Sequence, residues 1–120
     1  MIDDQLKKGS THTLILAVLE TAPLHGYAIA REIESRSKDA LKMNEGSLYP
    51  ALRSLEREGF IVGTWETQES GPARRVYTLT ESGHGELAEK RARWQSFSEA
   101  VNGVLGDPFP GGRNNVPQPA

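Results

Sequence analysis

The hydrophobic pattern of this 120-residue chain changes its period twice, after Gly59 and again at Thr80. Before Gly59, apolar residues recur at helical spacing. The helices expected there cover residues 5–20, 25–37 and 45–58. Residues 60–66 and 74–79 are instead rich in β-branched and aromatic side chains, and a turn separates them, which predicts a β-hairpin. Helical spacing returns after Thr80, which can cap the following helix. Three helices, a hairpin and a long helix predict a mainly helical fold, a winged helix-turn-helix with a long C-terminal helix.

The segment at residues 45–58 has clear boundaries. Asn44 is a favoured N-cap residue, and Gly59 suits the left-handed backbone that often follows a helix. Pro50 is expected in the first turn, where its missing N–H leaves no acceptor unpaired. The buried face is formed by Leu48, Leu52 and Leu55. The other face carries Ser47, Tyr49, Arg53 and Arg57. Residues 25–37 would complete the helix-turn-helix, although the link before Asn44 is long for a tight turn.

The last helix, residues 81–105, favours a dimer. It is roughly 37 Å long, whereas the part of the chain before it should form a ball about 30 Å across. The helix should therefore overhang its own domain. Its apolar stripe consists of Leu87, Trp94, Phe97, Val101 and Val104, with Lys90 interrupting it. A monomer rarely tolerates such an exposed stripe, and pairing with a second copy would bury it. The alternative is that the helix folds back onto its own core.

The composition argues against several kinds of site. The chain has no cysteine, which excludes disulfides and thiolate metal sites. The three histidines lie on different predicted elements, so no metal site is expected. No nucleophile–base arrangement or phosphate loop predicts an enzyme, and no cofactor is expected. The acidic start and the short apolar runs predict a cytoplasmic protein outside any membrane. The net charge of −2 counts mildly against nucleic-acid binding, but phosphate contact depends on local charge.

The end of the chain differs in composition from the rest. Residues 106–120 hold four prolines, three glycines and two asparagines, which predicts a disordered tail. The expected organisation is therefore a winged helix-turn-helix domain over residues 5–80, a dimerisation helix over residues 81–105 and the tail.

Several motifs follow one another in a specific order and spacing: residues 25–29 (HGYAI), 46–52 (GSLYPAL), 55–59 (LEREG) and 71–80 (GPARRVYTLT), followed by Gly83. Together they resemble the PadR family of bacterial transcriptional regulators. The single C-terminal helix resembles the smaller members. The resemblance implies a winged-helix homodimer that binds operator DNA, usually as a repressor. It also implies release by a small aromatic effector, which in small members stacks on a tryptophan of the last helix; Trp94 is the matching position.

The helix at residues 45–58 supplies candidate contacts to DNA. Tyr49 points away from the leucine face, so its phenol is expected to reach a phosphate or a base edge; the alternative is that it braces the preceding helix. Ser47 and Arg53 lie near the same side, and Arg53 is expected to contact guanine or phosphate unless it pairs with Glu45 or Glu56. Asn44 is expected to cap the helix and not to contact a DNA base. Lys42 is a candidate for holding a phosphate before the helix.

The hairpin supplies Arg74 and Arg75. A basic hairpin suits phosphate or a narrow minor groove. Because adjacent residues of a strand face opposite ways, at least one of the two arginines, but not both at one place, is expected to meet DNA. The alternative is an ordinary solvated strand edge. Trp65 is expected to pack on the hairpin.

Two functions compete. The first is a homodimeric repressor that places its third helix in the major groove and is released from its operator by a small aromatic ligand. In it, Trp94, Phe97 and Val101 form the dimer interface or the ligand site. The alternative is a winged-helix protein-interaction module without DNA binding, which the acidic isoelectric point favours slightly.

Overall fold

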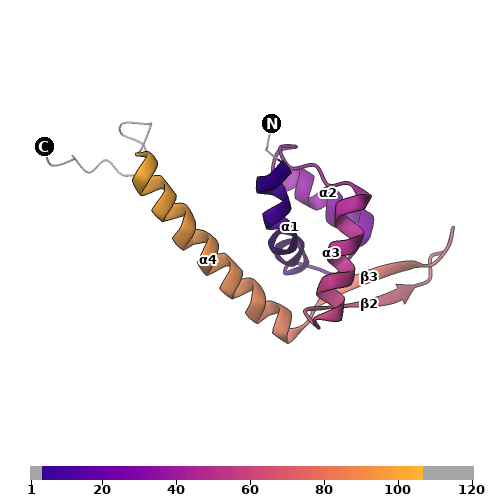
Figure 1. Cartoon of the computed structure of the whole chain (residues 1–120). Coiled ribbons are helices and arrows are strands. Elements are labelled where there is room, and N and C mark those ends of the chain that lie inside the picture. The colour runs from indigo at the N-terminus through magenta and orange to yellow at the C-terminus, as the bar shows by residue number, and fades with distance from the viewer. Residues whose placement is uncertain (1–3, 107–120) are drawn as a thin grey trace, which may run out of the picture.

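The computed structural model describes residues 4–106, with side chains from Ser10 onward (Figure 1). The helices are α1 (Asp4–Leu19), α2 (Gly26–Arg36), α3 (Glu45–Arg57) and α4 (Glu81–Leu105). The strands are β1 (Leu24–His25), β2 (Ile61–Glu66) and β3 (Arg74–Leu79). The predicted element order and the mainly helical winged helix-turn-helix class are confirmed. Of the predicted tail, residues 107–120 lie outside the described residues.

The core lies between the first three helices and one face of the sheet. Its fully buried large side chains are Ile15, Leu16, Ile29, Leu52, Leu55, Ile61 and Leu87. Each such burial is worth about 1.5–3 kcal/mol relative to an exposed side chain. Leu87 comes from the beginning of α4, so this part of the helix belongs to the core. The apolar stripe expected along α4 therefore does not start at Leu87.

A two-residue strand extends the predicted hairpin into a three-stranded antiparallel sheet. β1 lies beside β3, with Leu24 opposite Tyr77 and His25 opposite Val76, and the strand order is β1-β3-β2. The sequence did not predict β1, because two residues are too few to show an alternating pattern. The strand ends where α2 begins, so it anchors the helix-turn-helix to the wing, which is the β2–β3 hairpin.

The link between α2 and α3 is held by short-range hydrogen bonds. Lys38 and Asp39 adopt positive φ angles of 53° and 66°. The Asp39 N–H donates to the Glu34 carbonyl at 2.7 Å, and the Ser37 hydroxyl donates to the same carbonyl at 3.1 Å. These bonds satisfy the end of α2 and turn the chain towards α3, which accounts for a link longer than a tight turn.

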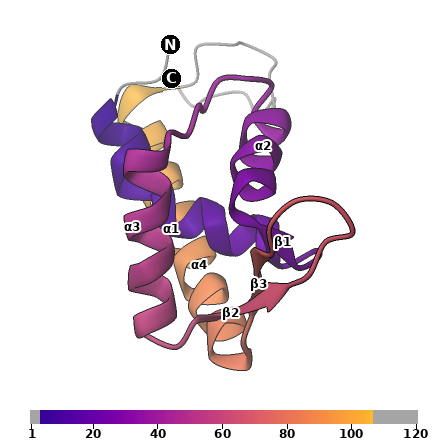
Figure 2. The same cartoon turned by 90° about the vertical axis from the view of Figure 1, so that its right-hand side faces the viewer.

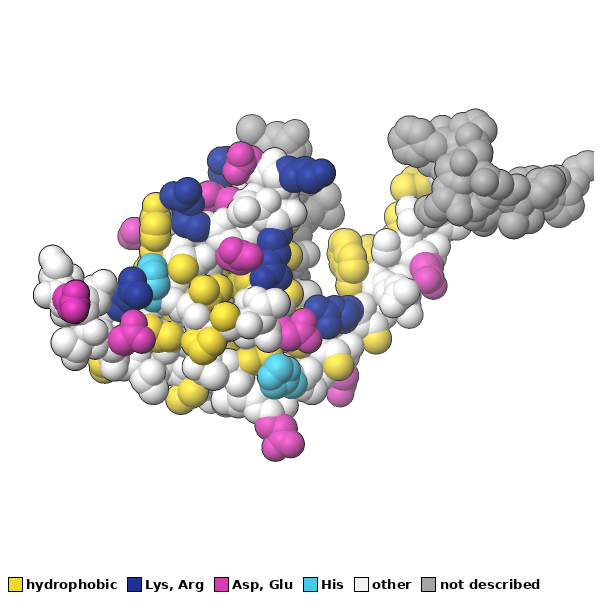
Figure 3. All heavy atoms as spheres, turned by 180° about the vertical axis from the view of Figure 1, so that it is seen from behind, with side chains coloured by type: hydrophobic (Ala, Val, Ile, Leu, Met, Phe, Trp, Pro, Cys, Tyr) yellow, Lys and Arg dark blue, Asp and Glu magenta, His cyan; other side chains and the backbone are white. Residues whose placement is uncertain are grey.

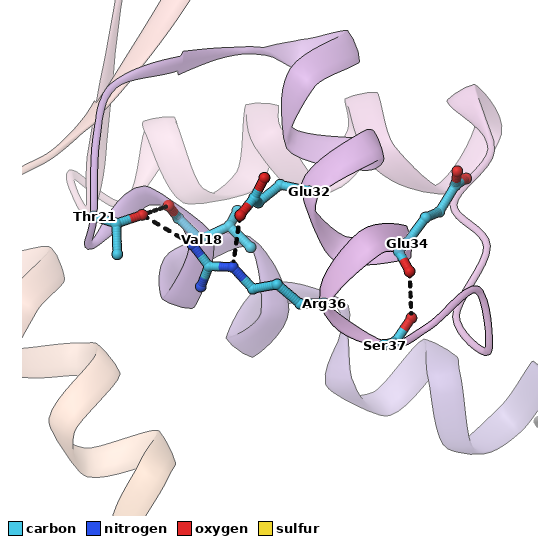
Figure 4. Close-up of polar contacts among 6 residues, drawn as sticks. All are labelled: Val18, Thr21, Glu32, Glu34, Arg36 and Ser37. Carbon is cyan, nitrogen blue, oxygen red and sulfur yellow. Dashed lines mark hydrogen bonds and ion pairs between the residues drawn. The ribbon is translucent and has the colours of Figure 1, made fainter.

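Arg36 ties the end of α2 to the end of α1 (Figure 4). Its Nε donates to Glu32 at 2.8 Å, and its Nη2 donates to the Thr21 hydroxyl at 2.9 Å. The Thr21 hydroxyl in turn donates to the Val18 carbonyl at 3.0 Å. This chain of bonds fixes the two helices relative to each other.

Pro50 lies deeper in its helix than the sequence predicted. Because α3 begins at Glu45, Pro50 is its sixth residue and lies in the second turn. Its missing N–H deprives the Gly46 carbonyl of the hydrogen bond that a residue four positions later supplies in a helix. The expected first-turn position was therefore wrong, and the exposed proline is a local cost to α3.

Replacing Pro50 with alanine is expected to raise the free energy of unfolding by about 1–3 kcal/mol, because it restores that hydrogen bond and removes the clash of the ring with the preceding turn. Chemical denaturation followed by circular dichroism measures the change. Ser54→Ala on the same helix is the control and should gain at most about 0.5 kcal/mol. An unchanged or lower stability of Pro50→Ala would show that α3 is adapted to the proline.

Candidate nucleic-acid interface

Two elements with exposed polar side chains lie on one side of the domain. α3 stands beside α2 with the wing next to them, whereas α4 lies behind (Figure 2). α4 leaves the domain on the side opposite the wing (Figure 1). The side formed by α3 and the wing is therefore accessible to a large ligand.

The beginning of α3 is built around Asn44. The Asn44 side chain accepts a hydrogen bond from the Ser47 N–H at 2.9 Å, so it caps the helix. This leaves the Asn44 oxygen occupied, as the cap interpretation expected. Ser47 is exposed on the first turn, where the positive end of the helix dipole favours a phosphate.

Further along α3, Arg53 and Arg57 are exposed. Within the described part of the chain, neither guanidinium forms an ion pair. Arg53 does not pair with Glu45 or Glu56, which were its alternative partners in the sequence. An exposed arginine without an intramolecular partner can offer its full fork of donors to a phosphate or to guanine.

Tyr49 packs against the beginning of α2. A Cβ atom built on Gly26 would lie 2.9 Å from the Tyr49 hydroxyl and 3.0 Å from its ring. The absence of a side chain at Gly26 therefore makes room for the phenol. This geometry agrees with the bracing alternative for Tyr49, although 36% of the side chain stays exposed. Contact of its edge with DNA stays a prediction.

Lys42 lies in the link before α3 and is largely exposed. Its ammonium group is 3.8 Å from the Asp39 carboxylate, in a pair whose side chains are 65% and 75% exposed. Such a surface pair contributes little and is easily exchanged for another anion. Lys42 therefore keeps the position expected of it, and its phosphate contact stays a prediction.

The two wing arginines point to opposite faces of the sheet. Arg74 lies 3.5 Å from Glu66, its cross-strand partner, at an exposed position. Arg75 lies on the α3 side and forms an ion pair with Glu56 of that helix. The hydrogen bond to Glu56 raises the pKa of Arg75 above its usual value. Arg74 is therefore the more accessible of the two.

A cluster on α2 was not recognised in the sequence. Tyr27 is 62% exposed, and the Arg31 guanidinium donates to its hydroxyl at 2.8 Å and lies 5.7 Å from its ring centroid. The ring of His25 is stacked nearly parallel to the Tyr27 ring, with 6.4 Å between the ring centroids. Burial, and then the charge of Arg74, lowers the pKa of His25, so this cluster adjoins the wing. The i, i+4 spacing of tyrosine and arginine was the available signal.

The second half of α4 carries an apolar stripe that is uncovered in the described part of the chain. Trp94 and Phe97 are 59% and 62% exposed, and their rings lie 6.3 Å apart. Val104 and Leu105 are more exposed still, whereas Val101 is partly covered. The alternative in which α4 folds back onto its core is not what the chain adopts, because hydrophobic side chains lie along the protruding helix (Figure 3).

The Arg91–Glu20 ion pair marks the point where α4 leaves α1. Its nitrogen and oxygen atoms lie 3.1 Å apart. Lys90, one residue earlier, is half-buried and pairs with Glu86 at 3.6 Å. The uncovered part of the helix thus begins directly after the Arg91–Glu20 ion pair.

The comparisons with known proteins agree with this arrangement. The family described as "Transcriptional regulator PadR-like family" matches residues 15–89. The negative transcriptional regulator PadR of Bacillus subtilis is 32% identical over 87 residues, 72% of this chain and 48% of that protein, so the chain spans about half its length. A transcriptional regulator of Mycobacterium tuberculosis is 34% identical over 69% of this chain and 71% of its own.

Solved structures have the same fold. A PadR family transcription regulator from Clostridium difficile has a TM-score of 0.70 and 30% identity, covering 81% of this chain and 99% of its own. A transcriptional regulator from Clostridium thermocellum has a TM-score of 0.81 at 24% identity, covering 88% of this chain and all of its own.

In the described residues, no helix combines the length and the apolar character needed to cross a bilayer. The family and these named relatives are transcriptional regulators and not enzymes. The chain belongs to the PadR-like family of transcriptional regulators.

Proposed function

We propose that the chain is a homodimeric repressor that binds operator DNA through α3 and the wing. The observation that carries the proposal is the exposed face of α3, where Arg53 and Arg57 have no ion-pair partner in the described part of the chain. A helix with this face, next to a hairpin, fits the major groove while the hairpin meets the adjacent backbone or minor groove. The Bacillus subtilis relative is named a negative regulator, which favours repression.

Local charge supports this interface despite the net charge of −2. On α3, Glu56 is neutralised by Arg75, whereas Arg53 and Arg57 are not paired in the described part. Ser47 on α3, Lys42 before it and Arg74 on the wing are also exposed. Phosphate contacts depend on such local cations and not on the overall charge.

We assign dimerisation to α4, with residues 5–80 as the DNA-reading domain. The rings of Trp94 and Phe97, with Val101 and Val104, form an apolar stripe that a second copy would cover. Two-fold symmetry then requires an operator that is close to palindromic, with half-sites about one helical turn or a multiple apart. The protein would act in the compartment that holds the DNA, the cytoplasm in a bacterium.

We further propose a small aromatic effector that stacks on Trp94. The exposed Trp94 and Phe97 rings lie at 42° to each other and offer a surface suited to an aromatic ligand. A ligand held between two copies would change the angle between their two DNA-reading domains and shift the dimer away from its DNA-binding form.

Arg53→Ala is expected to weaken binding to the operator by about 10- to 100-fold, because each good arginine contact to a base is worth about 1–3 kcal/mol. Fluorescence anisotropy against duplex from the gene's own upstream region, at several salt concentrations, measures the effect. Arg93→Ala is the matched control, since Arg93 is an exposed arginine on α4 that pairs with Glu89. Adding a phenolic acid to the same titration tests the effector.

Binding that weakens steeply with salt supports phosphate contact. Equal affinities of Arg53→Ala and wild type would remove α3 from the interface. If the wild-type chain bound no duplex, including mixed genomic duplex at low salt, the repressor proposal would fail. The winged-helix protein-interaction module would then be the better interpretation.

A further inference from the structure

Arg75 is enclosed by the protein in a way that Arg74 is not. It projects from β3 towards α3, where it forms the ion pair with Glu56, and its guanidinium lies 5.6 Å from the ring centroid of Trp65. The side chains of Arg75 and Glu56 are only 33% and 27% exposed. A phosphate would have to break this half-buried pair in order to recruit Arg75.

Gly63 on β2 creates the space for this arrangement. A Cβ atom built on Gly63 would lie 2.6 Å from Nε of Arg75 and 2.9 Å from its Cζ. The arginine therefore lies flat across the strand at the one position of that face without a side chain. Trp65, two residues along the same face, covers it from the side of the wing tip.

Tyr77 completes the group. It is opposite Gly63 in the sheet and is 6% exposed, and burial raises the pKa of its phenol. Glu56, Gly63, Trp65, Arg75 and Tyr77, which we call the Arg75 clamp, thus connect β2, β3 and α3.

The position of the clamp along the wing makes it mechanically important. β1 pairs with β3 only at Val76 and Tyr77, so beyond Val76 the wing is a two-stranded ribbon. Two-stranded ribbons twist strongly and are marginally stable by themselves. The Glu56–Arg75 ion pair ties this outer part of the wing to α3.

We propose that Arg75 is a positioning residue that sets the angle between the wing and α3, and that it does not itself contact phosphate. This inference rests on the proposed DNA-binding function. α3 and the wing must contact neighbouring parts of one duplex at the same time. A wing that is mobile relative to α3 loses conformational entropy on binding, which weakens the affinity for DNA. Arg74, on the opposite face, is left as the phosphate contact of the wing.

The salt dependence of binding separates positioning from contact. Each phosphate contact contributes about 0.9 to the slope of log K against log salt concentration. Arg74→Ala is expected to lower the slope by about one. Arg75→Ala is expected to weaken binding about 10-fold without changing the slope. Glu56→Gln should weaken binding to the same extent, and the Glu56→Gln/Arg75→Ala double variant should be no worse than either single variant.

The opposite results would overturn the inference. Suppose instead that Arg75 contacts phosphate and that Glu56 only competes with the phosphate for the arginine. Glu56→Gln would then bind DNA more tightly, because it removes a negative charge near the duplex and frees the arginine. Arg75→Ala would then also lower the salt slope. If the wild-type chain bound no duplex, the proposed function would fail, and the role of the clamp in DNA binding would fail with it.

A measurement without DNA tests the clamp independently. In the Trp94→Phe background, Trp65 is the remaining tryptophan. Glu56→Gln is expected to increase the quenching of Trp65 fluorescence by acrylamide, because Arg75 no longer lies against the ring. Circular dichroism confirms that the variant is folded. Unchanged quenching in a folded variant would show that Glu56 does not hold Arg75 in place.

Discussion

Gly83→Ala is expected to destabilise the chain by about 3 kcal/mol or more, because the position has no room for a methyl group. A Cβ atom there would collide with the Phe60 carbonyl oxygen and lie 2.8 Å from Cδ1 of Leu79. The carbonyl cannot easily move, since it accepts a hydrogen bond from the Thr80 N–H at 3.1 Å. The beginning of α4 would have to shift instead.

The same region contains three hydrogen bonds that such a shift would break. The Thr80 and Ser82 hydroxyls donate to the Gly59 carbonyl at 2.7 and 3.1 Å. The Thr80 oxygen also caps α4 by accepting from the Gly83 N–H at 3.0 Å. Loss of a cap alone typically costs about 1 kcal/mol.

Gly85→Ala is the matched control on the same helix. A Cβ atom at Gly85 would meet nothing within 4 Å. Because alanine favours a helix by about 1 kcal/mol over glycine, this variant should be more stable than wild type. Thermal and denaturant unfolding at one fixed protein concentration compare the two. A Gly83→Ala chain as stable as wild type would mean that the junction between the wing and α4 adapts freely.

Phe97→Asp is expected to weaken dimerisation by at least about 100-fold. In the proposed dimer, the carboxylate would be buried in an apolar interface without a partner, at a cost of several kcal/mol. In the single chain Phe97 is 62% exposed, so the substitution should change the free energy of unfolding of a monomer little. Loss of the dimer can then be separated from loss of the fold.

Analytical ultracentrifugation over a range of concentrations measures the dimerisation constant. Ala92→Asp adds the same charge to an exposed position on the opposite face of α4, as the helical spacing indicates, and should leave the dimer intact. The DNA affinity of Phe97→Asp should also fall, because a monomer contacts only one half-site, whereas the dimer contacts two. A wild-type chain that stays monomeric at tens of micromolar would refute the dimer, and a dimeric Phe97→Asp chain would locate the interface elsewhere.

The element order was readable from the sequence because it depends on local patterns. The leucine spacing of α3, the β-branched residues of the wing and the return to helical spacing after Thr80 each act within a few residues. The caps at Asn44 and Thr80 were predicted for the same reason, and both accept the expected N–H. The overhang of α4 followed from its length compared with the expected size of the preceding domain.

The details of the site were less predictable, because they depend on neighbours distant in the sequence. Arg75 meets Glu56 nineteen residues earlier, and no spacing rule links the two. Tyr49 lies against Gly26, and only the packing of α2 on α3 shows that a missing side chain makes room for the phenol. These contacts decide which candidate side chains remain available to DNA.

By itself, the sequence determined which segments form helices and strands, the caps at Asn44 and Thr80, and the apolar stripe of α4, since backbone propensity and hydrophobic period are local properties. Only the tertiary structure decided that β1 joins the sheet, that Leu87 belongs to the core and that Arg75 is engaged by α3 while Arg53 is not paired within the described part. These outcomes depend on distances between elements, and such distances arise only when the whole core packs.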